Sequence, residues 1–284
     1  MNKIKIWLAT VATRELVPEA LLLVFLKRGQ SWMVRWLVNS KKGAGMKNKT
    51  NLNATTRRNL LTTPVPTISA TLFAYYNLAQ FIPGISPLEA NNSNFVGTAF
   101  TMRALPVRAD LLEAVSDGSS PNLHRQAMAT VKKGQVLVTD CGGQNNISFF
   151  GELISTYLKK KGVAAIVTDA GIADTEDVAR TGLPVFAQGS APVPGAASSL
   201  VLDLNCPINC MGVTIMPNDV IVGDSNGVVA IPRQITDKVA ELAEKKERME
   251  RFLLKKLQEG APLDGTYPPD KKTLELYEQY TKSK

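Results

Sequence analysis

The stretch 151-GELISTYLKKKGVAAIVTDAGIAD-174 decides the fold of this chain, because it runs from a helix through a turn into a strand and a loop. Gly162 ends the helical part, and 163–169 is a short apolar run rich in β-branched residues. The loop that follows is built from small residues, which let the backbone approach a ligand closely. The stretch therefore predicts a buried strand that delivers the carboxylate of Asp174 into a tight loop.

The same alternation of strands and helices continues on both sides of this stretch. Strands rich in β-branched residues that alternate with helices are typical of an α/β core. In such sheets, ligands gather at the carboxyl ends of the strands, where loops and helix N-termini converge. We predict helices over 67–78, 122–132, 147–160 and 174–180, and strands over 95–104, 135–140, 163–169 and 183–187.

Beyond residue 211 the pattern changes to closely spaced strands and then to helices. Asn226-Gly227 favours a tight hairpin, because both residues adopt positive φ readily. Gly260 is placed to end a long helix with one apolar face. The fold class is therefore α/β, with a β-rich layer and a C-terminal amphipathic helix. The predicted elements are strands over 212–216, 220–224 and 228–232 and helices over 236–259 and 272–280.

The composition is that of a globular protein, with 44% hydrophobic and 20% charged residues in 284. The net charge of +8 is concentrated in residues 1–63, which leave 21 of the 33 basic and 23 of the 25 acidic residues for 64–284. This remainder offers no basic surface of the kind that phosphate backbones select, so we expect no nucleic acid partner. Three cysteines form no disulfide framework, which favours buried structural cysteines and a cytoplasmic protein.

We interpret residues 1–63 as a basic N-terminal extension, poorly ordered or non-native, with Met46 as an alternative start, and 64–284 as the folded domain. The apolar run over 20–26 is too short to span a membrane, which takes roughly 18 or more apolar residues. The acidic residues before it argue against a signal peptide. An amphipathic anchor on a membrane surface is the alternative, but we expect no membrane partner for the folded domain.

The sequence has no nucleophile elbow, no phosphate-binding loop and no dinucleotide-binding glycine pattern. His124 is the only histidine, and its helical context favours a packed or capping side chain over a catalytic one. Two strand ends carry more chemistry, one at 140–143 and the other at 169–174. Both combine aspartate with glycine, so both are candidate ligand sites.

Two readings of the second strand end stay open from the residues alone. In the first, the backbone N–H groups of Gly151, Glu152, Leu153 and Ile154 bind an anionic carboxylate at a helix N-terminus, and Asp174 holds a hard divalent cation. In the second, Asp174 is only the N-cap of the helix that follows it.

At this point the sequence resembles the RraA-like family. This family includes 4-hydroxy-4-methyl-2-oxoglutarate aldolases, which also decarboxylate oxaloacetate, and the regulator of ribonuclease E activity. The resemblance covers about 64–280, and the order and spacing of its segments carry it rather than any single motif. These segments are 122-NLH-124, 134-GQVLVTD-140, 151-GEL-153, 169-DAGIAD-174, 217-PND-219 and 223-GDSNGVV-229.

The resemblance implies a swivelling β/β/α layered domain, homotrimers or hexamers, and Mg²⁺ or Mn²⁺. It implies that Asp174 holds the metal, that a metal-bound water shuttles protons, and that the backbone of 151–154 binds the substrate. Asp177 matches a further, supporting acidic position. In the enzymes of the family, an acidic residue is followed by twenty residues and then Arg-Asp. Here Glu152 is followed by 153–172 and then by Ala173-Asp174, so Ala173 stands at the position of the family arginine.

This departure affects the expected chemistry, because the arginine grips the carboxylate and keto oxygen of the substrate in the family. A bidentate charge-assisted contact is hard to replace. Arg180, Arg103, Arg125 or a lysine of 159–161 are the candidates to reach in, although the lysine run favours a solvated helix end.

We therefore expect a metal-dependent lyase that acts on a small α-keto acid, with an altered substrate or reduced activity. The alternative is a non-catalytic oligomeric ring that binds a protein partner, like the ribonuclease regulator. Ala173 favours the second hypothesis, and the retained Asp174 favours the first.

Overall fold

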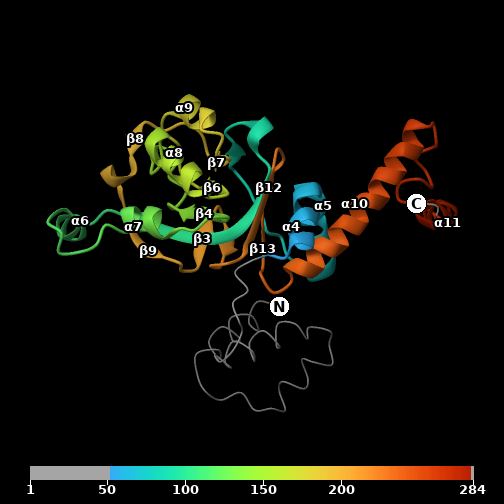
Figure 1. Ribbon diagram of the computed structural model, residues 1–284, viewed down its shortest axis with the longest axis horizontal. Helices are drawn as coiled ribbons and strands as arrows, with labels where there is room; N and C mark the ends of the chain where they lie inside the picture. Colours follow the sequence, from blue (N-terminus) through green and yellow to red (C-terminus); the bar gives the residue numbers. More distant parts are fainter. Residues whose placement is uncertain (1–51, 283–284) are drawn as a thin grey trace, which may run out of the picture. The chain divides into compact units, whose positions relative to one another are not determined.

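The computed structural model describes residues 52–282, which form a nine-stranded mixed sheet with helices packed on it (Figure 1). The strand order is β1-β13-β12-β3-β4-β6-β7-β2, and β9 also pairs with β3. Strands β3, β4, β6 and β7 run parallel, and the other pairings of this sheet are antiparallel. The strands are β1 Phe81–Ile82, β2 Ser86–Pro87, β3 Phe95–Pro106, β4 Gln135–Asp140, β6 Ala165–Thr168, β7 Val185–Ala187, β9 Ser199–Leu204, β12 Val220–Asp224 and β13 Gly227–Ile231.

Two small two-stranded sheets and the helices complete the fold. The short strands are β5 Ile147–Ser148, which pairs with β8 Val193–Pro194, and β10 Ile208–Cys210, which pairs with β11 Val213–Ile215. The helices are α4 Ala54–Thr62, α5 Val65–Tyr76, α6 Ala109–Ser116, α7 Leu123–Thr130, α8 Glu152–Lys161, α9 Thr175–Arg180, α10 Thr236–Gln258 and α11 Lys271–Lys282, with 3-10 turns η1 Ala90–Asn92 and η2 Gly195–Ala197.

Strand β3 organises the core, because its residues enter three separate apolar clusters. Phe100 and Met102 pack with α7, α8 and α9, and Ala99 packs with the β10–β11 hairpin on the other side. Val96 packs with α4, α5 and the first half of α10. Side chains alternate between the two faces of a strand, so one long strand can support all three layers. The predicted α/β architecture with a β-rich part is confirmed.

Most predicted elements are present with shifted ends, and one differs in kind. The helix predicted over 147–160 begins only at Glu152. Before it, Ile147 and Ser148 form β5, and Ile147 pairs with Val193 from a distant part of the chain. Residues 147, 149 and 150 are buried apolar side chains in the largest cluster, so tertiary packing holds this segment extended.

The organised region begins earlier than residue 64. Helix α4 lies inside the predicted extension, and its N-cap Asn53 accepts a 2.7 Å hydrogen bond from the Thr56 backbone N–H. The Thr56 hydroxyl donates to Asp237 of α10 at 2.7 Å, and Leu60 is buried against α5 and α10. Such a cap stabilises a helix by about 1 kcal/mol. Residues 54–62 therefore pack with the folded domain, and the prediction for 1–51 lies outside the described residues.

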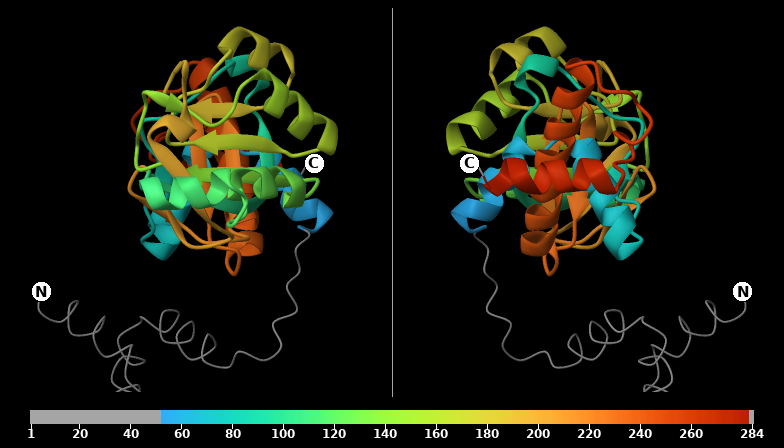
Figure 2. Two further views of the ribbon diagram at one scale, coloured as in Figure 1. Left: turned by 90° about the vertical axis from the view of Figure 1, so that its left-hand side faces the viewer. Right: turned by 90° about the vertical axis from the view of Figure 1, so that its right-hand side faces the viewer.

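Helices α10 and α11 form an arm at the C-terminal end, and in the right-hand view of Figure 2 the red helix α11 lies across the foreshortened α10. The first half of α10 packs on α4 and α5 through Val239, Ala240 and Ala243. Its outer face carries ion pairs between residues three or four apart, as expected for a solvated helix. Further along, Phe252 contacts Tyr277 and Tyr280 of α11, with ring centroids 5.4 and 5.2 Å apart. None of the helices within 52–282 is long and apolar enough to cross a membrane.

Candidate functional site

The start of helix α8 lies directly beside the loop that carries Asp174. Gly151 is the N-cap of α8 and offers no side chain to bond the free N–H groups of the first turn. A Cβ atom at Gly151 would lie 2.6 Å from Oδ2 of Asp174. Only glycine therefore lets the Asp174 carboxylate come this close to the helix N-terminus.

Asp174 occupies the N-cap position of α9 but does not cap it. Its backbone is left-handed, with φ 50° and ψ 44°, and its side chain makes no capping hydrogen bond. The Oδ2 atom instead accepts a hydrogen bond of 3.3 Å from the backbone N–H of Glu152. The reading of Asp174 as an N-cap is therefore wrong, because the exposed carboxylate is aimed at α8 rather than at its own helix.

Backbone hydrogen bonds hold the two loops of the site together. The N–H of Ala173 donates to the carbonyl of Phe150 at 3.1 Å, and the N–H of Gly171 donates to Ile147 at 2.9 Å. A Cβ atom at Gly171 would lie 2.3 Å from Cβ of Ala191, so only glycine fits between these segments. The small residues of this loop therefore serve the packing of backbone on backbone, in addition to leaving Asp174 accessible.

Two of the arginines considered as replacements for the family arginine are engaged elsewhere. Arg180 pairs with Asp177 and Glu176 on its own helix α9. Arg103 pairs with Asp203 at 2.9 Å. Asp177, predicted as a supporting acid, thus forms an ion pair with the guanidinium of Arg180. The cationic contact expected at residue 173 is not supplied by these side chains.

The lysine run at the end of α8 bonds to backbone carbonyls at two of its three positions. Lys161 donates to the carbonyls of Met128 and Ala129 at 2.7 and 2.6 Å, and Lys159 donates to Gly182. These contacts tie α8 to the end of α7 and to the turn after α9. Lys159 and Lys161 are therefore structural ties, a role that the expected solvated helix end did not include.

The other strand end proposed from the sequence, at 140–143, is a structural turn. The buried carboxylate of Asp169 accepts hydrogen bonds from the N–H groups of Cys141 and Gly143 at 2.6 and 2.8 Å. Asp140 accepts from Gly142 and Asn209 at 3.1 and 3.0 Å. Burial raises the pKa of Asp169 to about 6 despite these bonds. Both carboxylates therefore shape the loop instead of facing a ligand.

His124 is a packed histidine, as its helical context predicted. Its Nε2 lies 3.0 Å from the carbonyl oxygen of Phe149, and its ring lies against Phe149 and Phe150 at 5.6 and 6.0 Å. Burial lowers the pKa of the imidazole, which favours the neutral ring with Nε2–H as donor. His124 therefore positions the segment that leads into Gly151.

A small cleft of about 220 Å³ opens beside His124. Its polar lining includes Ser148 and Ser199, and Ser199 accepts a 3.0 Å hydrogen bond from Gln144. No local sequence pattern predicted this cleft, because α7, β5, η2 and β9 meet only in the folded chain. The lining residues are Asn122, Leu123, His124, Ser148, Phe149, Pro194, Gly195, Ala196, Ser199, Leu200 and Val201.

The cysteines and the acidic residues limit the metal chemistry of the described residues. Cys141 and Cys210 are buried and free, as predicted, and Cys206 is free and partly buried. No group of three or more His, Cys, Asp or Glu side chains within 52–282 is placed to hold a metal ion.

The fold and the site define a class of protein. Residues 65–230 match the RraA-like family, described as Aldolase/RraA, and the chain belongs to this family. The predicted RraA-like fold is also that of solved structures. An uncharacterized protein from Pseudomonas syringae pv. tomato superimposes with a TM-score of 0.66 at 21% identity, over 77% of this chain and 99% of that chain.

Three further similar proteins have different names. The chain is 35% identical over 188 residues to the uncharacterized protein MJ0644 of Methanocaldococcus jannaschii, which is 65% of this chain and 83% of the relative. It is 30% identical over 187 residues to a protein of Halalkalibacterium halodurans provisionally named 4-hydroxy-4-methyl-2-oxoglutarate aldolase, which is 66% and 80% of the two chains. Streptomyces coelicolor RraAS2, described as an unusual member of the RNase ES inhibitor RraA protein family, superimposes with a TM-score of 0.63 at 25% identity, over 71% and 96%.

Proposed function

We propose that this protein is a divalent-metal-dependent C–C lyase that acts on a small α-keto acid. The reaction type is that of a 4-hydroxy-4-methyl-2-oxoglutarate aldolase or an oxaloacetate decarboxylase, in line with the name of the relative from H. halodurans. One observation carries the proposal: the exposed carboxylate of Asp174 lies against the N-terminus of α8, at the N–H of Glu152. The proposed cation site at Asp174 thus lies next to the proposed anion site at the start of α8.

The backbone at the start of α8 supplies the anion site. Its first N–H groups have no partner inside the helix, and the helix dipole adds partial positive charge at this end. Gly151 places no side chain over these groups, and the N–H of Glu152 among them contacts Asp174 at 3.3 Å. In the proposal, the backbone of 151–154 binds and orients the carboxylate of the keto acid.

The donor set at Asp174 fits Mg²⁺ or Mn²⁺ held mainly by water. These hard cations prefer oxygen ligands, and Mg²⁺ commonly keeps several waters beside one or two carboxylates. Asp174 supplies one such carboxylate, which accepts a 3.3 Å hydrogen bond from the N–H of Glu152. When bound, the ion would polarise the keto oxygen and stabilise the charge left as the C–C bond breaks. Asp174 is the residue of this chain that we assign to hold it.

The alanine at 173 sets the expected level of activity. Removing a group that steadies developing negative charge typically costs a factor of about 10²–10³ in rate. Arg180 and Arg103 are bound to acidic partners instead. We therefore propose one of two consequences. Either the enzyme is slow, or backbone N–H groups alone bind the negative charge of its substrate.

Ala173 also favours a second function, that of an oligomeric ring that regulates a protein partner. The relative RraAS2 is described with the RNase ES inhibitors, which supports this alternative. The face of α8 next to the site exposes Leu153 and Tyr157, at 85% and 50% of their surface. These side chains are four residues apart on one helix face, so they support a contact between copies, proposed as a homotrimer.

The test is turnover of oxaloacetate and of 4-hydroxy-4-methyl-2-oxoglutarate by the full chain, with Mg²⁺ and with EDTA. Asp174→Ala and Ala173→Arg are assayed beside it, and Asp110→Asn, an exposed acid on α6, is the matched control. Metal-dependent turnover that Asp174→Ala abolishes and Asp110→Asn retains establishes the lyase. Activity that appears only in Ala173→Arg overturns the lyase and favours the regulatory ring.

A further inference from the structure

The cleft beside His124 has walls that depend on the close approach of two segments. A Cβ atom at Gly195 would lie 2.7 Å from the ring of Phe149, so a larger residue in η2 would displace this ring. The other side of the cleft is formed by α7, where His124 contacts the same ring with centroids 5.6 Å apart. Most of the remaining lining is apolar and includes Leu200 and Val201. The cleft therefore has a defined shape and a largely apolar interior.

Ser148 gives the cleft a hydroxyl group that no protein group satisfies. The residue is 8% exposed, and its hydroxyl makes no hydrogen bond to any residue within 52–282. A buried hydroxyl group without a partner is destabilising, so native proteins seldom retain one that neither water nor a ligand reaches. Because Ser148 lines the cleft, a molecule bound there can supply the missing partner.

Ser199 presents a second hydroxyl group, and its proton is unused. The residue is 1% exposed, and its oxygen accepts a 3.0 Å hydrogen bond from the side-chain amide of Gln144. The oxygen of the same amide accepts from the hydroxyl of Ser198 at 3.3 Å, which orients its nitrogen toward Ser199. The proton of Ser199 is therefore left for another acceptor, and this side chain also lines the cleft.

The first turn of α7 adds backbone donors to the two hydroxyl groups. Asn122 caps this helix by accepting a 3.0 Å hydrogen bond from the N–H of Arg125. The N–H groups of Leu123 and His124 have no partner within the described part of the chain, and the helix dipole adds partial positive charge at this end. All three residues from 122 to 124 line the cleft. Donors from α7, β5 and β9 therefore meet at one cleft.

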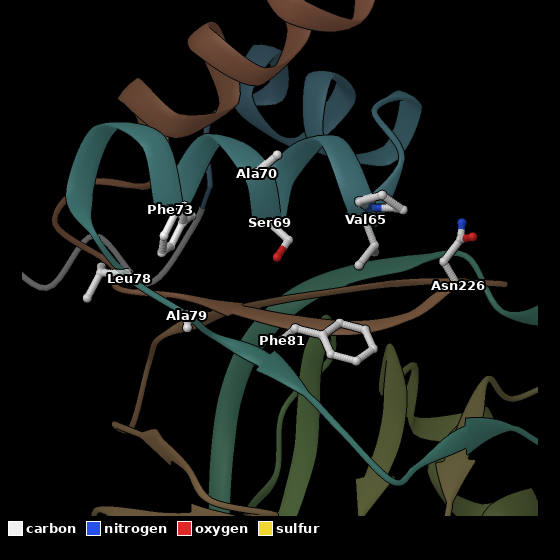
Figure 3. Close-up of a pocket in the computed structure, with 9 residues that line it drawn as sticks. Val65, Ser69, Ala70, Phe73, Leu78, Ala79, Phe81 and Asn226 are labelled. Carbon is white, nitrogen blue, oxygen red and sulfur yellow. The ribbon is translucent and has the colours of Figure 1, made fainter.

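The larger groove between α5 and β1 lacks buried donors of this kind. It measures about 670 Å³, and Figure 3 shows Val65, Ser69 and Phe73 turned from α5 toward the strand. The polar residues among its described lining are Ser69 and Asn226, and neither is buried, so water can satisfy both. The groove is larger, but its lining does not select a class of ligand. The cleft beside His124 is therefore the stronger candidate for a binding site.

We infer that this cleft binds a small carboxylate whose apolar body is about the size of one ring. Carboxylate oxygens only accept hydrogen bonds, which suits a set of free donors. None of the described residues that line the cleft is charged, so a doubly charged phosphate would lack a counter-charge. The volume of about 220 Å³ corresponds to about seven waters at roughly 30 Å³ each. It lies below the usual range for drug-sized ligands, so the ligand is small.

This binding site goes beyond the proposed function and does not depend on it. The described lining of the cleft includes none of residues 151–154, 173 and 174. It also includes no acidic side chain, so the cleft takes no cation of the kind proposed at Asp174. Binding in the cleft can therefore be measured without turnover and without a metal ion.

The experiment titrates benzoate into the full chain by calorimetry, with EDTA present so that no cation at Asp174 contributes. Benzamide, which has the same ring without the negative charge, is titrated in parallel. Ser148→Ala removes the unpartnered hydroxyl, and Ala196→Leu narrows the cleft from an exposed position. Ser155→Ala and Ala197→Leu are the matched controls, a buried serine with an unpartnered hydroxyl and an exposed alanine, both outside the lining. Thermal unfolding checks that each variant is folded.

We expect benzoate to bind the wild type saturably with a Kd on the order of 1 mM, as befits so small a ligand. Benzamide is expected to bind about tenfold more weakly. Ser148→Ala is expected to weaken benzoate about tenfold, because a hydrogen bond to a charged group is lost. Ala196→Leu is expected to abolish binding, and both controls to keep it.

Several outcomes overturn the inference. Absence of saturable benzoate binding does so directly. Binding that either Ser148→Ala or Ala196→Leu leaves unchanged does so as well, because the carboxylate then lies elsewhere. Benzamide that binds as tightly as benzoate shows that the negative charge is not recognised. An equal loss of binding in the two controls shows that the effect is not specific to the cleft.

Discussion

The Oδ2 atom of Asp174 accepts a hydrogen bond from the backbone N–H of Glu152 at 3.3 Å. This bond joins the loop after β6 to the first turn of α8. A bond of this length is weak, so the carboxylate can exchange it for a stronger partner. The glycine between them makes the approach possible, since a Cβ atom at 151 would lie 2.6 Å from Oδ2. The Asp174 carboxylate is thus oriented toward α8, and it can still bind a ligand.

We predict that Gly151→Ala lowers the free energy of unfolding by up to about 1 kcal/mol, because the new methyl group displaces the exposed Asp174 carboxylate, which can rotate away. The same substitution in an Asp174→Ala background is expected to cost less, since the nearest remaining atom is Cβ of Ala173 at 3.7 Å. Urea unfolding of the four proteins gives the coupling energy. An equal loss of stability from Gly151→Ala in the wild type and in Asp174→Ala would show that residues 151 and 174 do not interact.

A second prediction concerns ligands of the proposed site. Oxalate with Mg²⁺ is expected to raise the melting temperature of the wild type, because a ligand that binds only the native state stabilises it by ~2.7 kcal/mol at 100 times its Kd. EDTA removes the effect if the cation is part of the site. Asp174→Ala is expected to lose the shift, and Asp110→Asn to keep it, in the same thermal scan. A shift that survives in Asp174→Ala would place the binding elsewhere.

The position of Asp174 could be predicted from the sequence, because its signals are local. The apolar run over 163–169 marks the strand, and the small residues after it mark a loop at the carboxyl end. The resemblance of 169-DAGIAD-174 added a role for the carboxylate. Local signals also placed β4 and α10 within one residue of their observed ends.

What the sequence missed depends on distant partners. The segment 147–150 has helix-compatible residues, yet Ile147 pairs with Val193 and is held in a strand. The polar sequence of α4 looks like part of a basic tail, but its contacts with Asp237 of α10 and the burial of Leu60 hold it on the domain. Arg180 is ion-paired with Asp177 on its own helix, and spacing alone could not show this.

A third prediction tests His124 as the residue that positions the segment before Gly151. His124→Phe leaves the Phe149 carbonyl without its donor, which costs about 1–3 kcal/mol when the group is buried. His124→Gln can still donate from its amide and is expected to recover part of the loss. Urea unfolding at pH 7.5 compares the three proteins. An equal loss in both variants would show that ring packing, rather than the hydrogen bond, is the contribution of His124.

His124 also gives a pH dependence with a defined sign. Burial lowers the pKa of the folded imidazole below its ordinary value near 6.5, so the unfolded chain binds the proton first as the pH falls. The stability contributed by neutral His124 is therefore present above about pH 6.5 and is lost as the pH falls below it. His124→Gln is expected to remove this decline in a series of urea unfolding curves.

The last prediction concerns two buried carboxyl groups, Asp169 and Asp219, whose effect on stability has the opposite sign. Burial raises the pKa of each from the ordinary value of 3.8 to about 6. Between these values the folded protein binds more protons than the unfolded chain, so the free energy of unfolding falls as the pH rises. The loss is on the order of 3 kcal/mol for each group. Asp169→Asn is expected to flatten the decline between about pH 4 and 6.

A matched control separates titration of Asp169 from damage to its loop. Gln188 donates to the backbone carbonyls of Asp169 and Gly143 at 2.6 and 3.0 Å, so Gln188→Ala weakens the same loop without removing the carboxyl group. We expect Gln188→Ala to lower the free energy of unfolding at every pH and to keep the wild-type slope. Asp169→Asn is expected to lower it most at low pH, where the protonated acid is favourable. Parallel curves for all three proteins would show that Asp169 does not titrate in this window.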